Sequence, residues 1–162
     1  MLAIDMNVSE SCASVDGRPL REAVQAIARD AGVERGSISL AIVDDATIHA
    51  LNRRHLGHDY ATDVLSFVLE SGEGWLEGEV VASMETAARR APEFGWAAAD
   101  ELLLYVVHGA LHLVGHDDQD PEARRAMRAA ERKYLSRSGI QLRESAEDAS
   151  NDDHPRGRAS DG

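Results

Sequence analysis

The sequence lacks most features that mark secreted, disulfide-stabilised or membrane-spanning proteins. Its 162 residues contain a single cysteine, Cys12, which excludes an internal disulfide and fits a reducing compartment. No apolar run approaches the roughly 18 residues of a membrane-spanning helix, and the N-terminus lacks the basic start and apolar stretch of a signal peptide. We therefore expect one domain that acts in the cytoplasm, with no membrane partner.

Positive charge is also scarce. Lysine and arginine together number 17 against 29 acidic residues, which gives a net charge of −12. Residues 144–162 hold six acidic residues and two arginines, so they account for −4 and the rest of the chain carries −8. Strong non-specific binding to nucleic acid is not expected of such a chain. Because the composition turns polar beyond Leu142, we expect a folded domain over residues 1–142 and a disordered acidic tail over residues 143–162.

Hydrophobic periodicity predicts an α+β domain with a small mixed sheet of about four strands and about five helices. The predicted strands cover residues 4–8, 37–43, 63–69 and 77–84, and the predicted helices cover 18–31, 46–56, 85–90, 97–114 and 121–136. The segment 71–74 is a predicted reversal loop, and Pro92 is predicted to stop the helix that begins at residue 85. The helix over residues 97–114 is apolar nearly all round, so it is expected at the centre of the domain.

The central helix carries a pattern typical of a metal site. His108 and His112 are four residues apart, a spacing that places both imidazoles on one helix face and within reach of one ion. Gly115 allows the chain to turn after the helix, and Asp118 follows as the favoured third ligand, with His116 as the competing choice. Three such ligands suit Zn²⁺ and leave one position open for water.

One position separates two reaction classes. Zinc peptidases with a His-Glu-x-x-His helix carry a glutamate directly after the first histidine as the general base. Here that position is Gly109, so a metallopeptidase would lack its base and is the less favoured alternative.

Two motifs together resemble a known family. The upstream segment Thr62-Asp63-Val64-Leu65-Ser66-Phe67 and the downstream segment His108-Gly109-x-Leu111-His112-Leu113-x-Gly115 occur in the order and separation seen in the YbeY family. The resemblance covers residues 38–135. Members of that family are bacterial rRNA maturation factors that act as single-strand-specific zinc endoribonucleases. The resemblance implies the family's fold, one Zn²⁺ at the mouth of a cleft, and a role in 16S rRNA 3′ end maturation and ribosome quality control. It also implies rRNA, the small ribosomal subunit and ribosome-associated proteins as partners.

The sequence departs from the family pattern at two places. Where the family motif usually continues Gly-Tyr-Asp-His, this chain has Gly115-His116-Asp117-Asp118, so Asp118 stands at the third ligand position. An aspartate ligand is acceptable for zinc but makes the ion a weaker Lewis acid. Leu56 stands where the family usually has an arginine that contacts substrate phosphate.

Three residues are candidates for catalysis. Asp63 and Asp117 could orient the attacking water, and Arg54 could stabilise charge in the transition state. For Asp63, a turn or cap before the predicted strand is an alternative role. Local RNA contacts are expected from Arg53, Arg54, His58, Arg89 and Arg90. Four further arginines are interpreted as the solvated face of the last helix: Arg124, Arg125, Arg128 and Arg132.

A non-catalytic alternative remains. If His116 and Asp118 both bind the ion, four protein ligands would close the site, as in structural zinc sites. The chain would then be a ribosome-assembly binding protein with structural zinc and weak or no catalysis.

Overall fold

The computed structural model describes residues 1–12, 14–56, 63–117 and 119–142, and it confirms the α+β class with a four-stranded mixed sheet and five α-helices. The elements are β1 (Leu2–Val8), the 3₁₀ turn η1 (Glu10–Cys12), α1 (Arg18–Asp30), β2 (Arg35–Val43), α2 (Asp45–Leu56), β3 (Val64–Gly72), β4 (Trp75–Ser83), α3 (Met84–Phe94), α4 (Ala98–Leu113) and α5 (Pro121–Arg137). No helix of the described segments is long and apolar enough to cross a membrane. The expected disordered tail over residues 143–162 lies outside the described residues.

The sheet has the order β1-β2-β4-β3, in which β1, β2 and β4 run parallel and β3 is an antiparallel edge strand. The predicted loop over residues 71–74 is shorter in the structure, because Gly72 already pairs with Trp75 across the hairpin. Only two residues remain in the turn. The second, Gly74, has a φ of 74°, a left-handed conformation that glycine adopts without a steric penalty.

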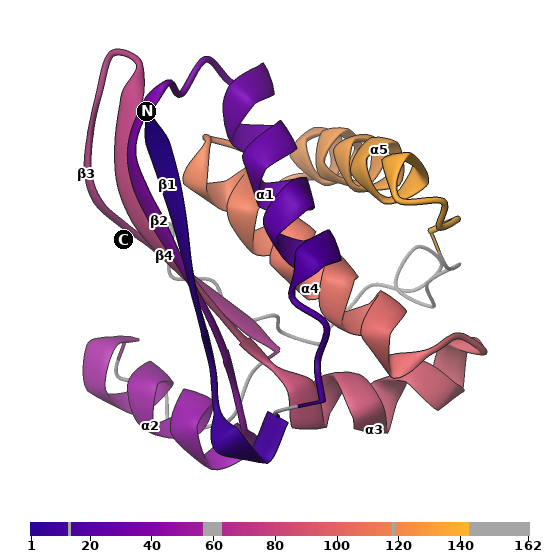
Figure 1. The fold of residues 1–162 in the computed structure, drawn as a ribbon. Coiled ribbons are helices and arrows are strands. Elements are labelled where there is room, and N and C mark those ends of the chain that lie inside the picture. The colour runs from indigo at the N-terminus through magenta and orange to yellow at the C-terminus, as the bar shows by residue number, and fades with distance from the viewer. Residues whose placement is uncertain (13, 57–62, 118, 143–162) are drawn as a thin grey trace.

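The two faces of the sheet are covered unequally. Side chains of a strand alternate between faces, and Ile38 and Leu40 of β2 point into the main core, to which α1 and α4 also contribute. Leu65 and Val81 point to the other face, where they pack against Ile48 of α2. Figure 1 shows α1, α4 and α5 on one side of the sheet and α2 on the other.

The central position of α4 follows from its composition. Every residue from Glu101 to Leu113 is buried, and the helix packs against α1, α3, α5, β3 and β4. Gly109 allows the closest approach to the sheet, since a Cβ at this position would lie 2.8 Å from Val80 Cγ1 and 3.0 Å from Ser66 Oγ. The Ser66 hydroxyl donates a hydrogen bond of 2.9 Å to the carbonyl oxygen of Gly109. The helix therefore sits directly on β3 and β4.

The prediction that Pro92 stops the third helix at residue 90 is wrong, because α3 continues to Phe94. Pro92 lies in the last turn, where its missing N–H removes one hydrogen bond without preventing a short extension. The helix ends at Gly95, which has a φ of 76° and donates its N–H to the carbonyl of Pro92. The left-handed glycine, and not the proline, terminates the helix.

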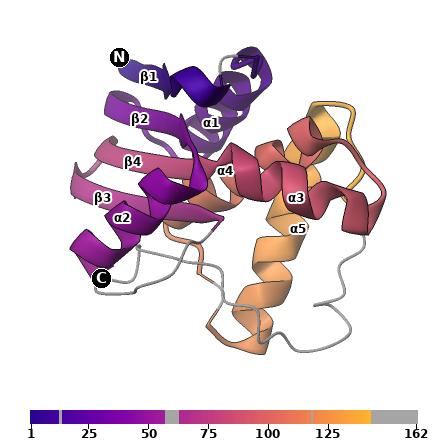
Figure 2. The ribbon, with the colours of Figure 1, turned by 90° about the horizontal axis from the view of Figure 1, so that it is seen from below.

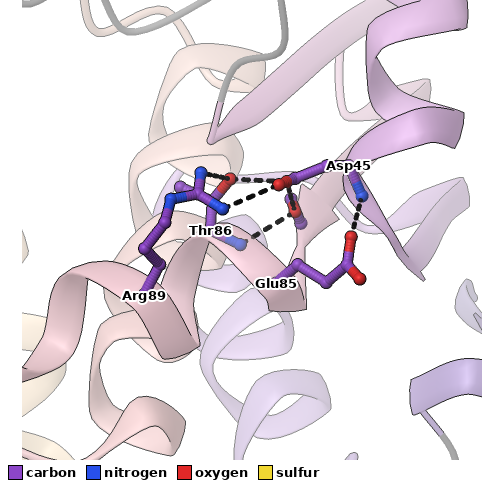
Figure 3. A network of polar contacts seen from close by, with 5 residues as sticks. Asp45, Glu85, Thr86 and Arg89 are labelled. Atoms are coloured by element: carbon purple, nitrogen blue, oxygen red, sulfur yellow. Dashed lines mark hydrogen bonds and ion pairs between the residues drawn. The ribbon is translucent and has the colours of Figure 1, made fainter.

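A polar network joins the beginnings of α2 and α3 (Figure 3). The Asp45 carboxylate accepts hydrogen bonds from Ser83 Oγ at 2.6 Å, Thr86 Oγ1 at 2.7 Å and Arg89 Nη1 at 2.8 Å. In return, the backbone N–H of Asp45 donates to Glu85 at 2.8 Å. These bonds hold α2 to the opposite end of the sheet from the β3–β4 hairpin.

Candidate metal centre

The two histidines of α4 converge as their spacing predicts. His108 and His112 are 2% and 5% exposed, and their Nε2 atoms are 3.1 Å apart, with the ring planes inclined by 71°. Two Zn–N bonds of about 2.05 Å at a tetrahedral angle would separate the nitrogens by about 3.3 Å. The observed arrangement therefore fits two nitrogen ligands of one ion.

A buried carboxylate contacts the other nitrogen of His108. Glu131 of α5 is 1% exposed, and its Oε2 lies 2.7 Å from His108 Nδ1. Its second oxygen accepts a hydrogen bond of 2.9 Å from Arg128 Nη1. The interpretation of Arg128 as part of a solvated helix face is wrong, because its side chain is only 16% exposed and is paired with this buried acid.

Sequence reasoning missed Glu131 because it assigned its charge to a solvated helix with many arginines. A signal was nevertheless present. Met127, Glu131, Tyr134 and Leu135 follow the i, i+4, i+7, i+8 spacing of one helix face, and all four are buried. A lone acid on an apolar stripe must find a partner inside the protein.

The turn after α4 forms at Gly115, which has a φ of 108°. The N–H of His116 donates to the carbonyl of Leu111 at 3.0 Å, and the N–H of Gly115 to that of His112 at 3.1 Å. His116 is partly exposed and Asp117 is exposed. Asp118 lies outside the described residues, so the third ligand stays a prediction. Within the described ranges, no group of three His, Cys, Asp or Glu side chains is placed to hold a metal.

Asp63 lies directly before β3 and is a buried carboxylate. Its Oδ2 lies 3.7 Å from Arg90 Nη1, and its backbone oxygen accepts the N–H of Ser83 at 3.0 Å. Arg90 is itself only 13% exposed and stacks 5.7 Å from the Phe94 ring centroid. Asp63 therefore joins β3 to α3, and Arg90 is turned inward, not toward an RNA ligand in solvent.

Further polar groups surround this ion pair inside the protein. Glu101, in the first turn of α4, accepts a hydrogen bond of 2.8 Å from Trp96 Nε1. Burial strongly raises the pKa of Tyr105, and the negative charges of Asp63 and Glu101 raise it further. Tyr105 therefore keeps its proton at any physiological pH. On α4, Tyr105 lies about one turn and Glu101 about two turns before His108.

The remaining cations expected to contact RNA are dispersed. Arg54 is exposed on α2, which packs on the sheet face opposite α4, and no hydrogen bond or ion pair joins it to the described histidines. Arg53 is exposed on the same helix, and Arg89 is held by Asp45. His58 lies outside the described residues. Figure 2 shows α2 and α5 on different sides of the molecule.

The geometry at Gly109 bears on the peptidase alternative. A side chain at this position would point at Val64, Ser66 and Val80 of the sheet. On the helix this direction differs from that of His108 by about 100° and from that of His112 by about 60°, and the packed sheet occupies it. The site has neither the glutamate base of a His-Glu-x-x-His peptidase nor room for it.

The fold and the paired histidines define an α+β protein with a candidate metal centre on its central buried helix. A family model described as "Endoribonuclease YbeY" matches residues 7–139, and the chain belongs to this family. A curated relative from Rhodopirellula baltica, named "Endoribonuclease YbeY", is 49% identical over 140 residues, which cover 85% of this chain and 72% of the relative. One from Salinibacter ruber with the same name is 42% identical over 131 residues, covering 75% and 83%.

A solved structure resembles the whole chain. The solution structure of a Thermotoga maritima protein matches with a TM-score of 0.58 and covers 96% of this chain and 100% of its own, at 23% identity. This likeness supports the fold.

Proposed function

We propose that this protein is a zinc-dependent endoribonuclease that cuts single-stranded RNA and acts on the 3′ end of 16S rRNA during ribosome biogenesis and quality control. The observation that carries the proposal is the convergence of His108 and His112 Nε2 atoms, 3.1 Å apart, on a buried helix. The chain's relatives are named endoribonucleases, which supports RNA as the substrate. The small ribosomal subunit is proposed as the partner from the family resemblance of the two sequence motifs. The single cysteine fits action in the cytoplasm.

His108, His112 and Asp118 are the proposed ligands of one zinc ion. The donor set fits zinc, since imidazole nitrogen and carboxylate oxygen both bind it and three protein ligands leave one position open. When bound there, zinc would supply Lewis-acid polarisation of a water molecule and of a phosphoryl oxygen. Burial of both imidazoles keeps competing water from their nitrogens and holds their orientation.

Other residues of the chain would orient the reactants. Of the two carboxylates considered for orienting water, Asp117 is exposed just after the Gly115 turn, whereas Asp63 is buried against Arg90. We therefore assign the water-orienting role to Asp117 and a positioning role at the start of β3 to Asp63. Arg54 stays the sequence-based candidate for contact with RNA phosphate, although it is exposed on α2, on the sheet face away from the two histidines.

The first test is the zinc content per chain of tag-free wild type, His116→Ala and Asp118→Ala. We expect loss of zinc only from Asp118→Ala, because three ligands then hold the ion and one position stays open. Loss from both variants would instead indicate a closed site with structural zinc. A wild type without zinc would overturn the mechanism.

The second test is cleavage of one RNA sequence presented as a single strand and as a duplex. Wild type is expected to cut the single strand, and His112→Ala is expected to lose the activity while Glu122→Gln, an exposed change on α5, keeps it. A casein assay separates the peptidase alternative. Equal cleavage of both RNA forms would contradict single-strand specificity.

A further inference from the structure

We propose that Glu131 is the positioning residue of the metal centre: held by Arg128, it fixes the His108 ring with Nδ1 protonated and Nε2 directed at the ion. This proposal has two tests, and only the first, the measurement of zinc affinity, depends on the zinc site proposed above. Its second readout concerns the metal-free protein, so the failures of the two proposals can be told apart.

The hydrogen-bond geometry sets the proton on His108. Glu131 Oε1 accepts from Arg128 at 2.9 Å and Oε2 lies 2.7 Å from His108 Nδ1. An ionised carboxylate only accepts hydrogen bonds, so Nδ1 must be the donor. In the neutral ring the lone pair then resides on Nε2, the atom that faces His112 Nε2 at 3.1 Å. A ring with its proton on Nε2 would first have to move that proton before it could bind a metal through that nitrogen.

The burial of Glu131 argues against a purely structural role. The residue is 1% exposed and shares its helix face with Met127, Tyr134 and Leu135. Removing a carboxylate from water is costly, and an apolar side chain of similar volume often serves stability as well as a buried ion pair. What an apolar residue cannot do is orient an imidazole. Carboxylates placed behind a ligating histidine commonly have this effect on metal affinity.

Arg128 completes the arrangement. Its side chain is 16% exposed, so it brings a positive charge from the surface to the inner carboxylate across one turn of α5. The guanidinium pairs with Oε1 at 2.9 Å and leaves Oε2 directed at His108 Nδ1. The imidazole, the carboxylate and the guanidinium therefore form one chain of contacts from α4 to the edge of α5.

Zinc affinity is the first test, measured by competition with a chromophoric chelator on the full chain. Glu131→Gln keeps the shape of the side chain but removes the charge, and we expect zinc binding about 10- to 100-fold weaker. Arg128→Ala should weaken it less. Glu122→Gln, an exposed acid on the same helix, is the matched control and should bind as wild type does. Unchanged affinity in folded Glu131→Gln would overturn the proposal, because a merely structural residue would change stability alone.

The second test needs no metal. Nitrogen-15 chemical shifts of the histidine rings distinguish the two neutral tautomers, and His108 can be assigned by comparison with His108→Gln. We expect Nδ1–H for His108 in the metal-free wild type and a mixed population in Glu131→Gln. An Nε2–H ring in wild type would overturn the positioning role even if zinc binds. If the wild type binds no zinc but shows the expected tautomer, the zinc proposal fails and the positioning geometry stands. If Glu131→Gln does not fold, the tautomer of His108 in the metal-free wild type decides the positioning role by itself.

Discussion

At the scale of single residues, Gly109 illustrates how tightly the candidate site is supported. A methyl group there would lie 2.8 Å from Val80 Cγ1 and 3.0 Å from Val64 Cγ2, both on stiff β-branched side chains. Gly109→Ala gains about 1 kcal/mol of helix propensity but overpacks the interface, which costs about 1–3 kcal/mol. We expect net destabilisation of about 1 kcal/mol, measured by urea unfolding.

A double-mutant cycle provides the control. Val80→Ala removes the methyl group that the new Cβ would meet, so adding Gly109→Ala to Val80→Ala should cost less than in wild type, or even stabilise. An equal loss in both backgrounds would show that the contact with Val80 is not the cause.

At the scale of secondary-structure elements, the junction of α2 and α3 depends on Asp45. Burial raises the pKa of Asp45, but hydrogen bonds from Ser83, Thr86 and Arg89 outweigh it and hold this pKa below its ordinary value of 3.8. The bonds stabilise the fold only while Asp45 is ionised. We expect Asp45→Asn to lower the free energy of unfolding at pH 7 by on the order of 2 kcal/mol, measured in urea.

The same variant has a predicted pH signature. A lowered folded-state pKa means that the unfolded chain binds the proton first, so the stabilisation is present above pH 3.8 and is lost as the pH falls through the folded-state pKa. The difference in free energy of unfolding between wild type and Asp45→Asn should therefore become smaller in acid. Glu122→Gln, an exposed change on α5, is the control, because it removes one negative charge outside this network. If this difference in free energy of unfolding does not change with pH, the charge of Asp45 is not what stabilises the junction.

The contact between α1 and α5 should respond to alkali. Burial, then the hydrogen bond to Asp30 and its negative charge, raises the pKa of Tyr134 to about 12 from 10.0. Between these values the unfolded chain has lost the phenolic proton and the folded chain keeps it, so stability falls as the pH rises from 10 to 12. In Tyr134→Phe, the free energy of unfolding measured in urea should fall less steeply between pH 10 and pH 12 than it does in wild type. If the free energy of unfolding falls equally steeply with pH in both proteins, Tyr134 is not the group that causes the loss of stability in alkali.

The elements themselves were largely predictable, because their patterns are local. Alternation in residues 37–43 and the apolar run before His108 each specify one structure. Two predicted boundaries differ from the structure. The third helix passes Pro92 and ends at the left-handed Gly95, three residues later. The predicted loop over residues 71–74 is shorter, because Gly72 pairs with Trp75.

At the scale of the whole molecule, the sequence predicts those parts of the candidate site that lie close together along the chain. The His108–His112 pair follows from helical spacing alone. Glu131 enters from a separate helix, and its contact depends on how α5 docks on α4, which no local pattern specifies. Likewise, the inward direction of Arg90 depends on Asp63, from a different element. Charge counted along the sequence cannot distinguish a solvated arginine from one that faces a buried acid.

The whole fold also decides how the protein should respond to loss of metal. The main core consists of apolar side chains from α1, α4, α5 and the sheet. Since a domain of this length buries enough apolar surface to fold by itself, the metal-free chain should stay folded, unlike a zinc finger. Free zinc at 100 times its dissociation constant adds about 2.7 kcal/mol of stability, which for a chain of this size raises Tm by about 5–10 °C. Calorimetry with and without chelator measures the shift, and His112→Ala should show none. A chelated wild type that has lost its far-UV circular dichroism would mean that zinc holds the fold together. The ion would then be structural, and the open catalytic site would lose its main physical support.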